Sequence, residues 1–65
     1  MKLYKVQLNE EWQNAFRYID PIIAKQIVFE YDNKEITVYH VLIGNGSISA
    51  GQCIPGNMLE ILEEL

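Results

Sequence analysis

The sequence predicts an α+β fold, with a small antiparallel sheet of three to four strands in the order β-α-β-β-β-α and helices packed on one face. Segments that alternate apolar and polar or β-branched residues occur at the start and in the centre of the chain, as in strands. Segments with an apolar residue every three or four positions lie between and after them, as in amphipathic helices. The 65 residues are expected to form one domain, 1–65, because so short a chain has no room for a second core.

The first strand is expected over residues 2–8. Its alternation places Tyr4, Val6 and Leu8 on one side, which is the pattern of a half-buried strand. Asn9 follows as a predicted helix N-cap, because its side chain can accept a hydrogen bond from the first turn of a helix.

An amphipathic helix is expected over residues 10–19, where apolar residues recur at spacings of four and three. The pattern consists of Trp12, Phe16, Ile19 and Ile23. Asp20-Pro21 interrupts it, since proline removes a backbone hydrogen bond from a helix. Either the helix kinks and continues through residues 20–26, or Asp20 caps a second short helix with Pro21 at its first position. The second alternative is favoured.

A hairpin is expected in the centre of the chain. Residues 27–31 and 35–43 are rich in β-branched and aromatic residues and flank Asp32-Asn33-Lys34, which predicts a three-residue loop with Asn33 in a left-handed conformation. Asn45-Gly46 suits a type I′ turn into a shorter strand near 47–54.

A last helix is expected over residues 57–65. Asn57 is a predicted cap, and Glu60 three residues later completes the pattern of a capping box. Its apolar side consists of Met58, Ile61, Leu62 and Leu65.

Strand 35–43 is apolar on both faces. Alternation assigns Ile36, Val38 and Leu42 to one face and Tyr39, Val41 and Ile43 to the other. One face is expected to meet the helices, so the other needs a cover. Because one cysteine and one histidine cannot form a disulfide or a zinc cluster, self-association is the expected source of extra stability. Tyr39, Val41 and Ile43 are the predicted contact residues of a homo-oligomer.

Charge and hydropathy exclude several classes of function. The net charge is −4, and the five Lys and Arg residues are scattered, which argues against direct binding of nucleic acid or of an anionic membrane. No apolar stretch approaches the roughly 20 residues needed to span a bilayer, and the start of the chain lacks the apolar core of a signal peptide. A lone thiol without an export signal fits the cytoplasm.

No residue pattern predicts an enzyme, a metal site or a cofactor. The segment 44–51 is Gly-rich, but Ser49 replaces the third glycine of a phosphate-binding fingerprint, which favours a tight turn. Cys53 and His40 could act as nucleophile and base only if the fold brought them together, and both fall on predicted strands. Paired carboxylates such as Glu10-Glu11 are expected to be solvated.

Glu60, Glu63 and Glu64 are the predicted partner-binding residues. Placed near the C-terminal end of a helix, they would oppose the helix dipole with no base nearby, and rules broken locally point to function. The leading hypothesis is a cytoplasmic protein–protein interaction module, an inhibitor or adaptor that self-associates and acts on a basic, nucleic-acid-binding protein, as in a mobile element. The alternative is a small-ligand (nucleotide or metabolite) binding protein that uses segment 44–51 at a subunit interface.

Overall fold

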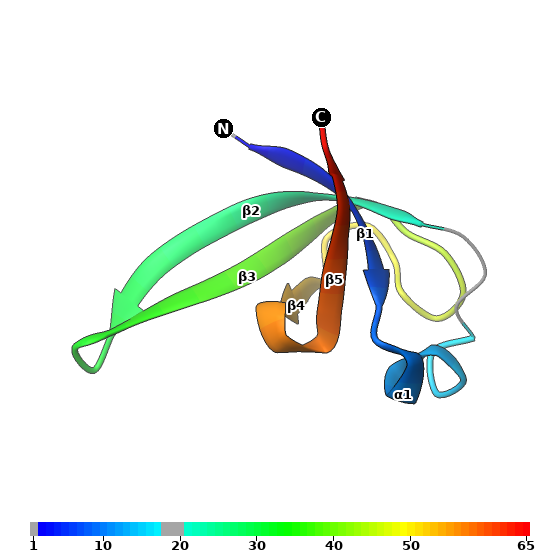
Figure 1. Cartoon of the computed structure of the whole chain (residues 1–65), viewed down its shortest axis with the longest axis horizontal. Coiled ribbons are helices and arrows are strands. Elements are labelled where there is room, and N and C mark those ends of the chain that lie inside the picture. Colours follow the sequence, from blue (N-terminus) through cyan, green and yellow to red (C-terminus); the bar gives the residue numbers. More distant parts are fainter. Residues whose placement is uncertain (1, 18–20) are drawn as a thin grey trace.

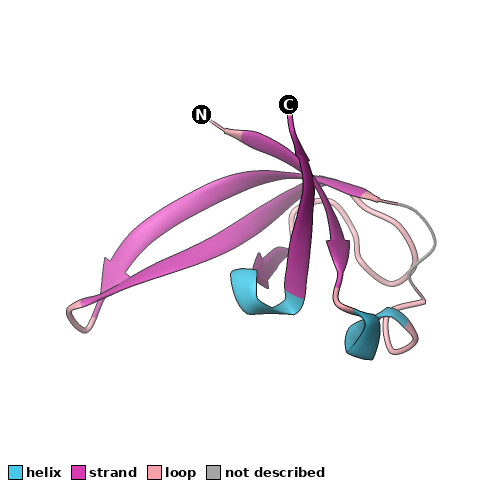
Figure 2. Ribbon diagram, in the orientation of Figure 1, coloured by secondary structure: helices cyan, strands magenta, loops and turns pink. Residues whose placement is uncertain are grey.

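The chain forms a five-stranded antiparallel sheet with the strand order β4-β3-β2-β1-β5, seen in a computed structural model that describes residues 2–17 and 21–65 (Figures 1 and 2). The strands are β1 (Leu3–Leu8), β2 (Ile22–Tyr31), β3 (Lys34–Ile43), β4 (Cys53–Pro55) and β5 (Leu59–Glu64). The only helices in the described residues are α1 (Glu10–Gln13) and the 3₁₀ turn η1 (Gly56–Met58). The α+β prediction is therefore wrong, and the molecule is mostly β-sheet.

The first strand is confirmed. Tyr4, Val6 and Leu8 are at most 7% exposed, while the residues between them are partly exposed. The alternation therefore identified both the strand and its buried side.

The prediction of a helix over residues 10–19 is wrong. α1 spans four residues, and the Asn9 side chain caps no backbone N–H but donates from Nδ2 to the Asn57 carbonyl oxygen at 2.9 Å. Residues 22–26, predicted either to continue this helix or to belong to a second short helix, lie instead at the start of β2, where Ile22 and Ala24 are fully buried opposite β1. Pairing between β1 and β2 satisfies the backbone hydrogen-bonding groups of both segments. A helix after Pro21 would satisfy only its own and leave those of β1 without this partner. The predicted cap at Asp20 lies outside the described residues.

The central hairpin is confirmed, with a loop one residue shorter than expected. Tyr31 pairs with Lys34, and the two loop residues Asp32 and Asn33 both have left-handed conformations, with φ of 51° and 60°. Two successive residues with positive φ are typical of the type I′ turn that matches the twist of a hairpin.

The prediction of a helix over residues 57–65 is also wrong. Residues 59–64 form β5, which pairs with β1 through partners such as Leu8 and Leu59. Leu59 is only 8% exposed, because it lies over the same core as Leu8. An unpaired edge of β1 would leave its backbone groups exposed, and β5 covers that edge.

The expected strand near 47–54 is reduced to β4, and most of segment 44–52 is a loop that packs against the turn after α1. Gly46 adopts a φ of 57°, and Ser47 N–H donates to the Phe16 carbonyl oxygen at 2.9 Å. A Cβ atom on Gly46 would overlap the carbonyl oxygens of Phe16 and Arg17. Glycine is therefore required here by close approach as well as by conformation.

The core lies on one side of the sheet, here called the inner face, where loops take the place of the predicted helices. Its buried side chains are Tyr4, Val6, Leu8, Ile22, Ala24, Tyr39, Val41, Ile48, Ile54 and Leu59, with Phe16 and Met58 packed against them. The opposite side is called the outer face.

The distal part of the β2–β3 hairpin extends beyond its neighbours and is called the arm (Ile27–Tyr31 and Lys34–Thr37). β1 pairs with β2 as far as Lys25, and β4 pairs with β3 only over Val38–His40. Figure 1 shows the arm projecting from the rest of the sheet, which is called the body. The arm is thus a two-stranded ribbon without lateral support.

Candidate functional site

The outer face of the arm carries an apolar surface. Cross-strand partners share a face, so the pairs Ile27–Val38, Phe29–Ile36 and Tyr31–Lys34 form three successive rows on the outer side. Phe29 is 44% exposed and Tyr31 is 70% exposed. Exposed large apolar residues gathered on one face, rather than scattered singly, are typical of contact surfaces.

The residues predicted for self-association are divided between the two faces. Tyr39 and Val41 are 4% and 1% exposed, so they belong to the core of the chain itself. Ile43 is 64% exposed. The register of β2 and β3 shifts by one residue between Ile23 and Ala24, which pairs Ile43 with Ile23 and moves it to the outer face.

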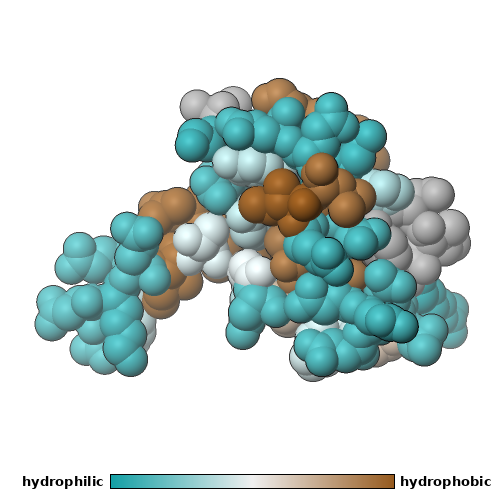
Figure 3. All heavy atoms as spheres, viewed as in Figure 1, coloured by the Kyte–Doolittle hydropathy of each residue, from teal (hydrophilic) through white to brown (hydrophobic). Residues whose placement is uncertain are grey.

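A cleft of about 620 Å³ separates the inner side of the arm from β4 and η1. Figure 3 shows the arm as a lobe at the left, divided from the body by a notch. The cleft is lined by Gln26, Glu35, Ile36, Thr37, Tyr39, Pro55, Gly56 and Asn57. Within it, Gln26 Nε2 donates to the Tyr39 hydroxyl oxygen at 2.9 Å. Glu35, Ile36 and Thr37 are consecutive in β3, so their side chains point to alternate faces of the sheet. Because all three line the cleft, the cleft borders the edge of β3 and not only one face.

Two glutamates face each other on the inner side of the arm. Glu30 and Glu35 are direct cross-strand partners, and both residues are exposed. Like charges directly opposite each other destabilise a hairpin. The arm therefore carries a local conflict that its own stability does not explain.

The predicted partner-binding glutamates lie on the edge strand β5 and not on a helix. Glu60 pairs with Gln7 on the outer face, and Glu63 Oε2 lies 3.6 Å from Lys5 Nζ in an exposed ion pair. Glu64 pairs with Tyr4 on the inner side. The three carboxylates thus do not share one face, and charges on an edge strand also discourage pairing with other sheets.

The Gly-rich loop does not present its backbone to an anion. The N–H groups of Ser47, Ile48 and Gly51 donate to carbonyl oxygens of the chain, and Ser49 N–H donates to Gln52 Oε1. A phosphate cradle needs such groups free and convergent. The predicted tight turn is the better description of this loop.

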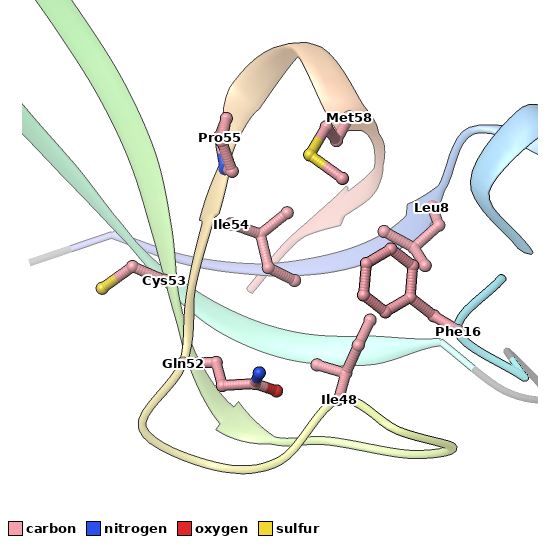
Figure 4. A pocket seen from close by; sticks show the side chains of 8 residues that line it. All are labelled: Leu8, Phe16, Ile48, Gln52, Cys53, Ile54, Pro55 and Met58. Atoms are coloured by element: carbon pink, nitrogen blue, oxygen red, sulfur yellow. The ribbon is translucent and has the colours of Figure 1, made fainter.

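A pocket of about 240 Å³ lies beside that loop (Figure 4). It is lined by Leu8, Phe16, Ile48, Gln52, Cys53, Ile54, Pro55 and Met58. Figure 4 shows the Phe16 ring and the Ile48 and Leu8 side chains around the same space, whereas the sulfur of Cys53 points away from it. The pocket suits an apolar group and offers no nucleophile.

Cys53 and His40 are register partners on the outer face, with Lys25 beside His40 on the other strand. The fold therefore does bring the two residues together, as the sequence alone did not predict. Cys53 is exposed, and His40 does not line the pocket that Cys53 borders. This arrangement lacks the enclosed space in which a nucleophile and base could hold a substrate.

No group of three or more His, Cys, Asp or Glu side chains in residues 2–17 and 21–65 could hold a metal ion. Within the same residues, no helix is both long enough and apolar enough to cross a membrane.

Comparisons of the chain with protein-family models, with curated proteins and with solved structures find no match.

Proposed function

We propose that this chain is a protein–protein interaction module, an inhibitor or adaptor that forms a homodimer through its outer face and acts on a basic partner protein. The observation that carries the proposal is the set of exposed apolar residues on the outer face, Ile43 in the body and Phe29 and Tyr31 in the arm, with the row of Lys25 and His40 between them.

A second copy is a suitable occupant of this face because of where the charges lie. Both carboxylates of β2 and β3, Glu30 and Glu35, are on the inner face, so two outer faces can approach without acidic residues of these strands meeting. In a chain of net charge −4, this segregation keeps the carboxylates of the two longest strands out of the contact, while Glu60 and Glu63 lie on the edge strand β5.

The proposed partner is basic because the surfaces that remain outside such a dimer are acidic. They include Glu30 and Glu35 on the inner face of the arm and Glu64 on the inner side of β5, all exposed. Complementary charge chiefly raises the rate of association and disfavours acidic competitors.

Self-association is tested by sedimentation equilibrium of Phe29→Glu. The native chain is expected to sediment at twice its 7.5 kDa. The variant is expected to weaken the dimer by about tenfold or more, because a carboxylate would be buried without a partner. Val28→Glu is the matched control, since Val28 is adjacent and 51% exposed but lies on the inner face. A native chain that sediments as a monomer, or equal weakening by both variants, would contradict the assignment.

The alternative, a small-ligand binding protein built on segment 44–51, is supported only for an apolar ligand. The pocket beside Ile48 is largely apolar, and the backbone N–H groups that a nucleotide phosphate would need already donate to oxygen atoms of the chain.

A further inference from the structure

We infer that the free edge of β3 in the arm binds an extended, cationic segment of the partner protein, which adds a strand to the sheet inside the cleft. This inference rests on the proposed interaction function and specifies the chemistry of the partner. It uses the inner side of the arm, opposite the face proposed for the homodimer.

The edge of β3 is open at the point where β4 leaves it. β4 pairs with β3 from His40 to Val38 and then turns away into η1 at Gly56. No strand in the described part of the chain continues this pairing along Glu35–Thr37. The same three residues border the cleft; Gly56 lies close to the Thr37 carbonyl oxygen, so an added strand has room beside Glu35 and Ile36.

The backbone of β3 offers hydrogen bonds to such a strand. Val41 N–H donates to the Gln52 carbonyl oxygen, on the side of β4. Backbone groups point to alternate sides along a strand, so those of Thr37 and Glu35 point to the same side. An incoming segment antiparallel to β3 would therefore continue the pairing beyond the end of β4, as in peptide recognition by strand addition.

The side chains of the arm select for positive charge on the inner side of that segment. A residue opposite Glu35 would share its face and lie in the row that begins with Glu30. A lysine or arginine there would offset the repulsion between the two glutamates. The next residue would lie opposite Ile36 and extend the apolar row of Phe29 on the outer face. The expected motif alternates basic and branched apolar residues.

A second copy of the arm fits this edge poorly. Pairing two β3 edges would bring Glu30 and Glu35 of both copies onto one continuous sheet, where four carboxylates would repel one another. The charge of the arm therefore favours a cationic segment over self-pairing.

The test uses the full chain and a fluorescent peptide of alternating lysine and valine, followed by fluorescence anisotropy at low salt. Saturable binding is expected, accompanied by NMR shifts of the Glu35 and Thr37 amides. N-methylation of the lysines should abolish binding, because it removes the N–H groups that face β3. N-methylation of the valines should preserve binding, since those groups face away. A peptide with the same residues in two blocks, three lysines and then three valines, should bind weakly.

Glu35→Gln is expected to raise the dissociation constant by about three- to tenfold, as the loss of a cross-strand charge pair implies. Glu10→Gln removes an exposed carboxylate from α1 and should leave the constant unchanged. Absence of saturable binding, equal binding of both N-methylated peptides, or equal effects of the two variants would overturn the inference. If the alternating peptide binds only the dimer, and its binding is lost in Phe29→Glu, the edge of β3 is not the peptide-binding site. A chain that is monomeric yet binds the peptide with this pattern would overturn the homodimer and leave the edge site intact.

Discussion

β2 and β3 each contain two regions with contrasting environments. In the body, Ile22 and Ala24 of β2 are completely buried, and Val41 of β3 is 1% exposed. In the arm, the same two strands carry Val28 and Phe29 at 51% and 44% exposure. Both regions contain β-branched and aromatic residues; the pairing is continuous in the arm, whereas in the body its register shifts between Ile23 and Ala24.

The contrast separates two roles that apolar residues play in a sheet. In the body they remove surface from water, at roughly 25 cal/mol for each Å². In the arm they maintain the ribbon through cross-strand pairs worth about 0.2–1 kcal/mol each, with much of their surface still in contact with water. An apolar ribbon that contributes little to its own core is best explained by the contacts it can make with other chains.

The largest expected difference comes from truncating one residue in each region. Ile22→Ala should lower the free energy of unfolding by about 2–5 kcal/mol, because it leaves a cavity in the core. Val28→Ala should lower it by less than about 1 kcal/mol, because half of that side chain is already exposed. Urea denaturation followed by circular dichroism measures both. Similar losses for the two variants would show that the arm is packed like the body.

A smaller effect is expected at the tip of the arm. Asn33→Val should lower the free energy of unfolding by about 1–2 kcal/mol, because a β-branched residue tolerates the φ of 60° poorly. Asn33→Gly should be neutral or slightly stabilising, since glycine adopts this conformation freely. The same denaturation measurement compares the two. If Asn33→Val is as stable as the native chain, the hairpin does not depend on its turn.

The smallest effect is expected from the opposed glutamates. Glu30→Gln should raise the free energy of unfolding by about 0.2–1 kcal/mol at low salt, because it relieves the repulsion with Glu35. The gain should shrink as added salt screens the charges. Glu10→Gln, at an exposed position in α1, is the control and should show no comparable gain. A loss of stability in Glu30→Gln would mean that this carboxylate stabilises the arm.

The parts of the fold that could be predicted from the sequence are those determined by local signals. The alternation of residues 2–8 and the composition on both sides of Asp32-Asn33 led to β1 and to the hairpin. Segment 44–51 is a loop whose N–H groups are engaged by the chain, but Asn45 lacks the positive φ of the expected type I′ turn.

The helix predicted over residues 57–65 is wrong because the sequence of this segment fits both the helical and the strand period. Around the C-terminal segment, Met58, Ile61 and Leu62 fit a helix, whereas Leu59 and Ile61 alternate with Glu60 as in a strand. Residues 59–64 form a strand rather than a helix because β1 needs a partner along its open edge. β1 lies more than 50 residues away in the chain. No local pattern contains that information.

The candidate surfaces were predicted only in part. Strand 35–43 was identified as apolar on both faces, but the register shift that moves Ile43 away from Val41 depends on β2 and has no signal within the strand. The cleft arises because β4 is shorter than β3, and the length of β4 was overestimated. The proximity of His40 and Cys53 likewise depends on the register between β3 and β4, which the sequence does not show locally.

The pairing of β1 with β5 has a consequence for the order in which the sheet forms. It joins segments about 50–60 residues apart, and closing so long a loop slows folding. The β2–β3 hairpin closes over a two-residue turn and needs no distant partner. Hairpins form within about 1–10 μs, far sooner than sheets dominated by distant contacts. The least buried part of the native molecule is therefore expected to be the first to acquire its structure, and its open edges are exposed to other chains before the body is complete.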